Sequence, residues 1–443
     1  MTAKRIAVVG GGPAGAAVAI GLRRVGEEVV LVGEPRRFAA VEGVSERVIG
    51  GLRAAGFERA LRCFAPPSPR CVTWNGVTSR ANTEQLVDRQ RFDEALLDDV
   101  AAHGVLLVPG RVVAISSSSA RYAITVEGRG AREVLEADFL VEARGRAAPG
   151  QGLPRVRGVE TVSLLQYWQG PRGPARSAVQ SLADGWAWMA ALEDGRRYLQ
   201  LTLDVASTML PPKRELGGFC RARLETIEAA RPFIHDAEPV GEPHARAATP
   251  VLHEAVVGDD WIRVGDAAMA VDPLSGNGIF QAMSSALQAP AVIGTLLHEP
   301  SRGALAQRFH RRRIDELFYR FARIGRDFYA QEPRWVRQPF WQLRRQWPDA
   351  EPIHAPTTPE TVRIARMPVV ADGRIVEEEV VVTPEQPLGI WHVDGVRLAP
   401  LLRAARTRGA GASIEEALRA QAGVAAADAA RLAAWMRARG WVG

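Results

Sequence analysis

Three glycines near the N-terminus have the residue type and spacing of a dinucleotide-binding turn. Gly10, Gly12 and Gly15 form a G-x-G-x-x-G motif after the apolar run 6–9. In this motif the first glycine permits a tight turn, the second lets backbone approach a pyrophosphate, and the third lets a helix pack on the strand. The helix N-terminus offers N–H groups to phosphates, and Glu34, which ends the next predicted strand, is placed to bind a ribose. The predicted contacts are Gly10, Gly12, Pro13, Ala14, Gly15 and Glu34.

Three later segments favour FAD over NAD. Arg89 precedes Phe92-Asp93 at the start of a predicted helix, the predicted strand in segment 137–149 ends in Glu142-Ala-Arg-Gly-Arg, and a strand ending in Gly265-Asp266 precedes a loop and a long helix. With the N-terminal glycines, these segments resemble the FAD-dependent aromatic hydroxylase superfamily with the p-hydroxybenzoate hydroxylase fold, across residues 1–345. Glu142 stands where that superfamily usually has aspartate, which is a modest departure that leaves FAD as the expected cofactor.

The resemblance implies roles for further residues. In the superfamily the Gly-Asp aspartate holds the ribityl chain, which points to Asp266 here. The backbone of Gly276, Asn277 and Gly278 would close on the flavin ring, and the following helix would direct its N-terminal dipole at the negative edge of the reduced ring. Ser45 is either a flavin contact or a helix N-cap. The other implied FAD contacts are Arg89, Val112 and Gly265, and the implied electron donor is NADH or NADPH.

Two tryptophans lie on one face of a predicted strand. Trp186 and Trp188 are two residues apart, so their side chains point the same way. Their stretch, GWAWMAAL, resembles the G-W-x-W-x-x-P segment of the flavin-dependent tryptophan halogenases, although Ala191 or Leu192 stands near the place of the proline. We expect both indoles, with Tyr167, to line an aromatic substrate pocket that excludes water. Ordinary packing between sheet and helices is the alternative.

The lysines argue against halogenation. Halogenases use a lysine near the substrate to carry the activated halogen, and the only lysines here are Lys4 and Lys213. Neither position suits that role, so we expect oxygen transfer. Loss of a proton from the hydroxylated ring needs a base, for which Asp272 and Glu42 are the predicted catalytic residues. The alternative for Asp272, before a proline, is a loop cap.

The predicted fold class is α/β. It combines a Rossmann-type FAD-binding domain, an inserted antiparallel β-sheet that forms a substrate domain, and a small C-terminal α+β domain of winged-helix-like type. That last domain would contain a hairpin around Asp372-Gly373 and three short helices. It would dock a polypeptide substrate, or act as a lid on the FAD-binding domain. The predicted boundaries are 1–155 and 246–346 for the FAD-binding domain, 156–245 for the sheet, 347–360 for a linker and 361–443 for the C-terminal domain.

Composition limits the partners. The net charge is +6, the densest basic run (308–318) falls in a helical pattern, and no recognition helix stands out, so we expect no nucleic acid. No apolar run reaches the length of a membrane span, and no leader segment is visible, so we expect a cytoplasmic protein without a membrane contact. The three cysteines lack metal-ligand spacing, so no metal site is predicted.

A halogenase-like core without the lysine resembles the flavoprotein maturases of tryptophylquinone enzymes, which include the peptidyl-tryptophan dihydroxylases of quinohaemoprotein amine dehydrogenase biogenesis. The resemblance implies an FAD-dependent monooxygenase that uses NAD(P)H and O₂ to hydroxylate the indole ring of a tryptophan in a partner polypeptide. The alternatives are a hydroxylase of a free small aromatic, a tryptophan halogenase-like enzyme, a flavin reductase of geranylgeranyl-reductase type, and a flavoprotein chaperone without turnover.

Overall fold

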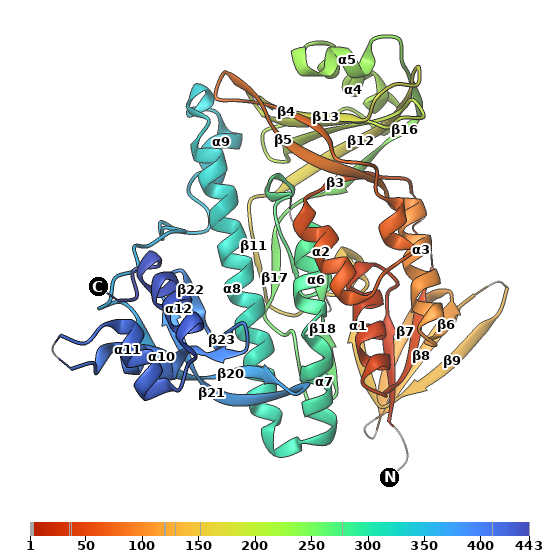
Figure 1. The fold of residues 1–443 in the computed structure, drawn as a ribbon. Helices are drawn as coiled ribbons and strands as arrows, with labels where there is room; N and C mark the ends of the chain where they lie inside the picture. Colours follow the sequence, from red (N-terminus) through yellow and green to blue (C-terminus); the bar gives the residue numbers. More distant parts are fainter. Residues whose placement is uncertain are drawn as a thin grey trace. The chain divides into compact units, whose positions relative to one another are not determined.

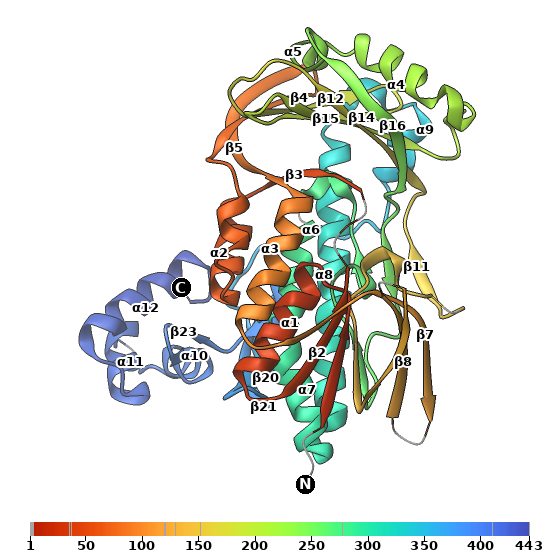
Figure 2. The ribbon, with the colours of Figure 1, turned by 90° about the vertical axis from the view of Figure 1, so that its right-hand side faces the viewer.

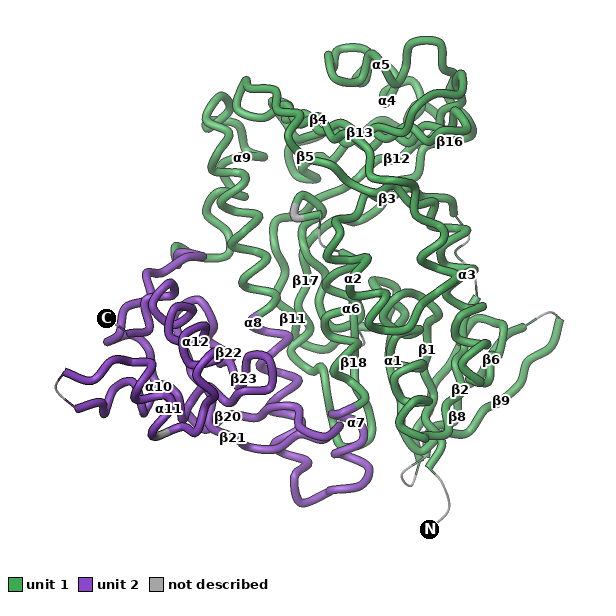
Figure 3. Tube along the Cα trace, viewed as in Figure 1, with its two compact units in different colours: residues 1–290, 317–350 green, residues 291–316, 351–443 purple. Residues whose placement is uncertain are grey.

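The chain folds into two compact units in a computed structural model (Figure 3). The structure describes residues 4–34, 36, 38–118, 121–128, 130–150, 152–276, 278–409 and 411–442. The first unit contains residues 1–290 and 317–350, and the second contains residues 291–316 and 351–443.

A five-stranded parallel sheet is the base of the first unit (Figure 1). Its strand order is β18-β10-β1-β2-β6, and β1 pairs in parallel with both β10 and β2. The apolar run of β1 is buried, as expected of a strand covered on both faces. The strands are β1 Arg5–Val9, β2 Glu28–Gly33, β6 Leu106–Pro109, β10 Phe139–Glu142 and β18 Trp261–Arg263. This is the predicted Rossmann-type sheet.

Four helices accompany this sheet and lie close to one another in Figure 2. Each begins directly after a loop or strand end that carries one of the predicted motifs, so the fold gathers those motifs at one edge of the sheet. The helices are α1 Pro13–Arg24, α2 Glu46–Ala55, α3 Arg89–Ala102 and α6 Gly278–Ala286.

A second, eight-stranded sheet lies above these helices in the view of Figure 1. Neighbouring strands are antiparallel except β13 and β4, which pair in parallel. The predicted strands of 156–245 are all present, but three strands come from residues 41–88, which we had placed in the first part of the FAD-binding domain. The predicted boundaries themselves stay predictions. In sheet order, the strands are β16 Glu238–Ala247, β12 Thr161–Gln169, β15 Arg196–Asp204, β14 Gly185–Ala191, β13 Arg176–Leu182, β4 Ser68–Trp74, β5 Val77–Asp88 and β3 Val41–Val44.

The two faces of the eight-stranded sheet carry different side chains. One face is mostly aliphatic, with Trp168 among its buried residues, and packs against α4 (Leu216–Glu225) and α5 (Arg231–Ile234). The other face holds aromatic residues, among them Trp186, Trp188 and Tyr198, which pack with side chains of α8 (Gly303–Ala330) and α9 (Pro339–Arg344). This second face is called the aromatic face below.

The first unit also contains two smaller sheets. One is a three-stranded meander and the other joins three short strands near the flavin motifs. Their strands are β7 Arg111–Ser118, β8 Arg121–Glu127 and β9 Arg132–Ala137, and β11 Arg155–Arg157, β17 Val251–His253 and β19 Met269–Ala270.

The second unit has its own core, formed by strands followed by helices. The predicted hairpin turns at Asp372 and Gly373, whose φ angles of 49° and 72° suit a type I′ turn. The backbone N–H of Ile375 donates to the Thr295 hydroxyl at 2.8 Å, which ties the hairpin to α7 (Ala289–His298). Residues 291–316 therefore join this unit. The elements are β20 Arg363–Ala371, β21 Arg374–Thr383, β22 Gln386–Ile390, β23 His392–Val393, β24 Val396–Arg397, α10 Leu398–Arg406, α11 Ile414–Ala422 and α12 Ala426–Ala438.

Candidate active site

The glycine turn after β1 is sterically restricted to glycine at two positions. Gly10 has a φ of +117°, and a Cβ there would lie 2.4 Å from the carbonyl oxygen of Ala143. A Cβ on Gly15 would lie 1.9 Å from the carbonyl oxygen of Gly10. These contacts let β1, β10 and α1 approach one another closely, which is the geometry that the motif requires.

Gly12 serves a different purpose from its two neighbours. It is the N-cap of α1, and a Cβ there would meet no atom within 4 Å. The first turn of α1 thus opens onto free space, where its backbone N–H groups can bind an anion. Pro13 and Ala14 begin this turn, and Glu34 directly follows β2. The arrangement fits the pyrophosphate of FAD.

The predicted flavin loop adds a second open cradle. Gly265 has a φ of +58°, and a Cβ there would lie 2.8 Å from the Cβ of Ala14, so this loop comes close to the start of α1. The adjoining Asp266 lies 3.6 Å from Nε of Arg146. Gly276, with a φ of +61°, and Gly278, which begins α6, would each meet no atom within 4 Å of a Cβ. Asn277 lies outside the described residues. The open glycines fit a flat ring at this loop.

An ion cluster surrounds Arg89 beside these loops. Arg89 pairs with Glu42 and, at 2.9 Å, with Asp93, and Nε of Arg36 lies 3.0 Å from the other oxygen of Asp93. Arg89 is buried, and the two carboxylates raise its pKa above the ordinary value. Glu42 thus lies in an ion pair with Arg89, and its role as a base stays a prediction.

Two further predicted FAD contacts, Ser45 and Val112, lie in different surroundings. Ser45 is the N-cap residue of α2, is exposed, and makes no side-chain cap hydrogen bond. Val112 lies in β7 and packs against the apolar cluster between the meander and the parallel sheet.

The predicted substrate residues meet on the aromatic face. Trp186 and Trp188 are buried at 3% and 9% exposure, and both belong to one apolar cluster. The ring of Tyr198 lies 6.1 Å from that of Trp188 and 5.0 Å from that of Tyr167, both edge to face. Trp186 and Trp188 lie on one face, as their spacing on the strand predicts, and the rings of Trp188, Tyr198 and Tyr167 are in contact in an aromatic wall. Their role in a substrate pocket stays a prediction.

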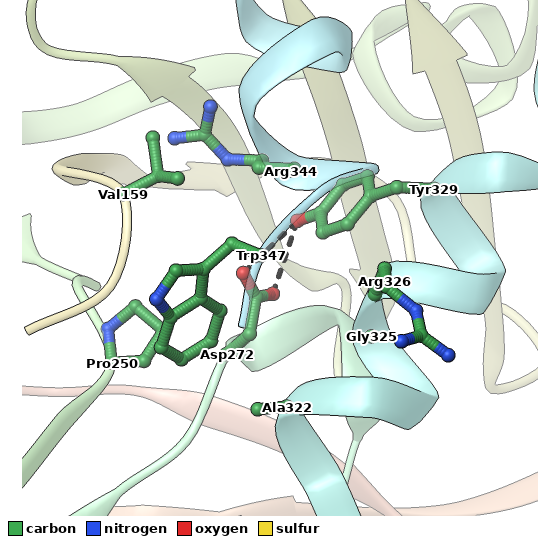
Figure 4. A pocket seen from close by; sticks show the side chains of 9 residues that line it. All are labelled: Val159, Pro250, Asp272, Ala322, Gly325, Arg326, Tyr329, Arg344 and Trp347. Atoms are coloured by element: carbon green, nitrogen blue, oxygen red, sulfur yellow. Dashed lines mark hydrogen bonds between the residues drawn. The ribbon is translucent and has the colours of Figure 1, made fainter. Parts of the chain in front are cut away.

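A chain of hydrogen bonds connects this wall to the flavin loop. The indole Nε1–H of Trp186 donates to the Tyr329 hydroxyl at 3.2 Å. That hydroxyl lies 3.1 Å from each carboxylate oxygen of Asp272 and donates to the carboxylate (Figure 4). Asp272 also accepts the backbone N–H of Leu274 at 2.9 Å, so the expected capping role is present alongside the polar chain.

Burial has the largest effect on the ionisation of Asp272 and Tyr329. Withdrawal from water raises the pKa of Asp272, while the bonds from Leu274 and Tyr329 and the charge of Arg344 lower it. Burial also raises the pKa of Tyr329 well above its ordinary value, so this phenol stays protonated and acts as the donor.

A narrow pocket opens beside Asp272. Figure 4 shows Asp272 and Tyr329 on its lining together with Arg326, Arg344 and Trp347. Its free space is close to that of one water molecule, so the pocket admits water and excludes an indole ring. Arg344 is anchored by the buried carboxylate of Asp204, at 3.2 Å.

Sequence reasoning missed Tyr329, Arg344 and Tyr198. Tyr329 lies in the aromatic-rich stretch RIGRDFYAQEPRW, and it is one of only five tyrosines in the chain. A tyrosine at the end of a long amphipathic helix was the available signal. Among the described residues, no group of histidine, cysteine and acidic side chains is arranged to hold a metal ion.

Comparison with known proteins bears on this geometry. No protein-family model matches the chain. The tryptophan 2-halogenase of Chondromyces crocatus is 26% identical over 360 residues, 74% of this chain and 68% of the relative. The putative FAD-dependent oxidoreductase LodB of Marinomonas mediterranea is 26% identical over 364 residues, 76% of this chain and 95% of the relative.

A solved structure resembles the whole chain. It is the peptidyl tryptophan dihydroxylase QhpG, described as essential for tryptophylquinone cofactor biogenesis, with 51% identity, a TM-score of 0.86 and full coverage of both chains. The fold and the glycine cradles define an FAD-dependent oxidoreductase of the aromatic hydroxylase and halogenase superfamily, as predicted. Within that superfamily, the chain belongs to the family of the peptidyl tryptophan dihydroxylase QhpG and is a flavin monooxygenase.

Proposed function

We propose that this enzyme hydroxylates a tryptophan side chain of a partner polypeptide during maturation of a tryptophylquinone cofactor. The full-length identity of 51% with the peptidyl tryptophan dihydroxylase QhpG carries the proposal. The lack of any lysine in residues 5–212 supports oxygen transfer over halogen transfer. NADH or NADPH is the proposed electron donor, and the cytoplasm is the proposed location.

Two cradles among the described residues would bind different parts of FAD. The open turn at Gly12 would hold the pyrophosphate, and the loop with Gly265, Asp266, Gly276 and Gly278 would hold the ribityl chain and the ring. Reduced FAD, when bound, supplies the activation of O₂ and the transfer of one oxygen atom to the ring. The backbone N–H groups at the start of α1 need no reorganisation to bind the phosphates.

The aromatic face would exclude water and orient the substrate indole. Trp188, Tyr198 and Tyr167 pack edge to face at 5.0–6.1 Å, and this rigid aromatic wall would contact the substrate indole. Trp186 is held in place by its bond to Tyr329. A dry chamber favours oxygen transfer because water would consume the activated oxygen.

Asp272 is the proposed base. Oxygen transfer to a ring carbon leaves a proton on that carbon, and the carboxylate would accept it as the ring regains aromaticity. Burial raises the pKa of Asp272 toward the working pH, which suits a group that takes and returns a proton. The water-sized pocket that Asp272 lines offers a route for that proton to leave.

The second unit is the proposed docking module for the polypeptide, through residues 361–443. The hydrophobic core of this unit and the capping box of α11 at Ser413 and Glu416 support an ordered surface. Hydrogen exchange of the FAD-loaded enzyme, with and without the polypeptide, checks this. Protection in α10, α11 and α12 is expected, and unchanged exchange there would contradict the docking role.

An intact-mass assay tests the reaction. The purified enzyme is mixed with FAD, NADH, a flavin reductase, O₂ and chloride, and is offered free tryptophan or, separately, a tryptophan-containing polypeptide encoded beside its gene. A gain of one or two oxygen atoms on the polypeptide alone is expected. Oxygen on free tryptophan alone, or chlorine on either acceptor, would contradict the proposal.

A further inference from the structure

We propose that Tyr329 is a positioning residue of the hydroxylation site, because its hydroxyl holds the carboxylate of Asp272 and the indole of Trp186 in one fixed arrangement. The inference deepens the proposed function, since it rests on Asp272 as the base. It concerns a residue that lies outside both cofactor cradles.

The hydrogen-bond capacity of Tyr329 is used on both sides. A phenol has one hydrogen to donate, and its oxygen can also accept. The donor is directed to Asp272 at 3.1 Å from each oxygen, and the acceptor receives Nε1–H of Trp186 at 3.2 Å. Three segments far apart in sequence thus meet at one oxygen atom: the flavin loop, the end of α8 and strand β14. Figure 4 shows the contact with Asp272 from the side of the pocket.

The ring of Tyr329 is fixed independently of its hydroxyl. Tyr329 is buried, and its ring packs edge to face against Phe340 at 5.7 Å and Trp341 at 5.8 Å, both on α9. Tyr329→Phe therefore keeps the packing and removes only the hydroxyl. A change in Asp272 or Trp186 in that variant reports the loss of the hydrogen bonds rather than a cavity.

Three arginines among the described residues lie near Asp272, on neighbouring elements of the same unit. Arg344 of α9 and Arg146 of the short helix 145–147 lower its pKa, and Arg326 of α8 lies on the same pocket. The hydroxyl of Tyr329 adds a hydrogen bond to the charged form. Without that bond, one of the interactions that lower the pKa of Asp272 is lost while the effect of burial remains. The pKa of Asp272 would therefore rise further.

The matched control is another buried tyrosine that donates to an aspartate. The hydroxyl of Tyr122 lies 2.9 Å from Asp260, in the meander sheet and away from the flavin loop and the aromatic face. Tyr122→Phe removes the same kind of bond, in a pair that is partly buried rather than fully buried. It should cost stability and leave the active site unchanged.

The test compares wild type, Tyr329→Phe, Tyr122→Phe and Asp272→Asn, all loaded with FAD. The carbonyl band of the protonated Asp272 carboxyl is identified in infrared spectra by its absence from Asp272→Asn. Its titration midpoint should shift upward by about 1 to 2 pH units in Tyr329→Phe, the equivalent of one hydrogen bond to a charged group. The midpoint in Tyr122→Phe should stay at the wild-type value.

Kinetics with the polypeptide provide the second readout. In Tyr329→Phe the acid limb of the kcat profile should move upward with the infrared midpoint, and kcat at neutral pH should fall about tenfold while KM stays within about twofold. An unchanged infrared midpoint and acid limb in Tyr329→Phe would overturn the role of Tyr329. Full activity in Asp272→Asn would instead overturn the proposed base, and the infrared comparison would still decide whether Tyr329 controls that carboxyl.

Discussion

Replacement of Gly12 by valine should abolish FAD binding while leaving the apoprotein folded. Gly12 has a φ of −75° and a ψ of −178°, which valine adopts without strain. A Cβ at this position meets no atom of the protein within 4 Å. The added side chain would therefore occupy only the space through which the pyrophosphate approaches the first turn of α1.

The expected loss of affinity for FAD follows from the hydrogen bonds to the phosphates that would be lost. Each hydrogen bond between a backbone N–H and a phosphate is worth about 1.5 to 3 kcal/mol. Displacing the pyrophosphate from two N–H groups costs about 3 to 6 kcal/mol, which raises the Kd for FAD by about 10² to 10⁴-fold. The free energy of unfolding of the apoprotein should change by less than about 1 kcal/mol, because the side chain contacts nothing.

Titration of the apoprotein with FAD, followed by quenching of flavin fluorescence, measures the Kd. Thermal unfolding of the same apoprotein measures its stability. Gly50→Val is the matched control, because Gly50 lies in α2 and a Cβ there also meets no atom within 4 Å. Gly15→Val is the opposite case, since its Cβ would collide with the Gly10 carbonyl, and it should unfold the turn. FAD binding by Gly12→Val with unchanged affinity would refute the assignment of this turn.

Two further predictions concern buried charges. Arg344→Met should destabilise the first unit by about 3 to 5 kcal/mol, because it leaves Asp204 buried without its cation; denaturant unfolding measures this, and Arg214→Met, at an exposed ion pair, should cost under about 1 kcal/mol. Glu332, whose side chain is fully buried, has a pKa lowered to about 2 by bonds from Arg334, Ser181 and backbone N–H groups. Its stabilisation of at most about 3 kcal/mol is present above the unfolded pKa and is lost as pH falls from about 4.5 to about 2. Glu332→Gln should flatten the stability profile in that interval, and an unchanged profile would contradict the assignment.

The nucleotide-binding half of the fold is predictable from the sequence because its signals are local. A buried apolar strand, a glycine turn and a helix follow one another without interruption, and the structure has β1, the turn and α1 in those places. The hairpin at Asp372-Gly373 is predictable for the same reason, since two residues with positive φ define its turn. The sequence did not predict that residues 41–88 contribute strands to the eight-stranded sheet. That assignment depends on pairing between strands far apart in the chain, such as β4 and β13.

The candidate site was only partly predictable. The periodicity of β14 placed Trp186 and Trp188 on one face, and both lie there. The link through Tyr329 could not be inferred, because it joins a loop, a strand and a helix separated by 57 and 143 residues. No local rule predicts which side chain of a long amphipathic helix reaches a loop that follows another strand. The ion pair between Glu42 and Arg89 could not be predicted from the sequence for the same reason.

Incorporation of ¹⁸O from ¹⁸O₂ into the partner polypeptide tests the central claim most directly. The FAD-loaded enzyme, a flavin reductase and NADH are incubated with the tryptophan-containing polypeptide under ¹⁸O₂, and fragment masses locate the label. One or two ¹⁸O atoms on the indole of a single tryptophan, absent in Gly12→Val, are predicted. Complete oxidation of NADH to NAD⁺ with reduction of O₂ to hydrogen peroxide and an unlabelled polypeptide, or label outside tryptophan, would contradict the account.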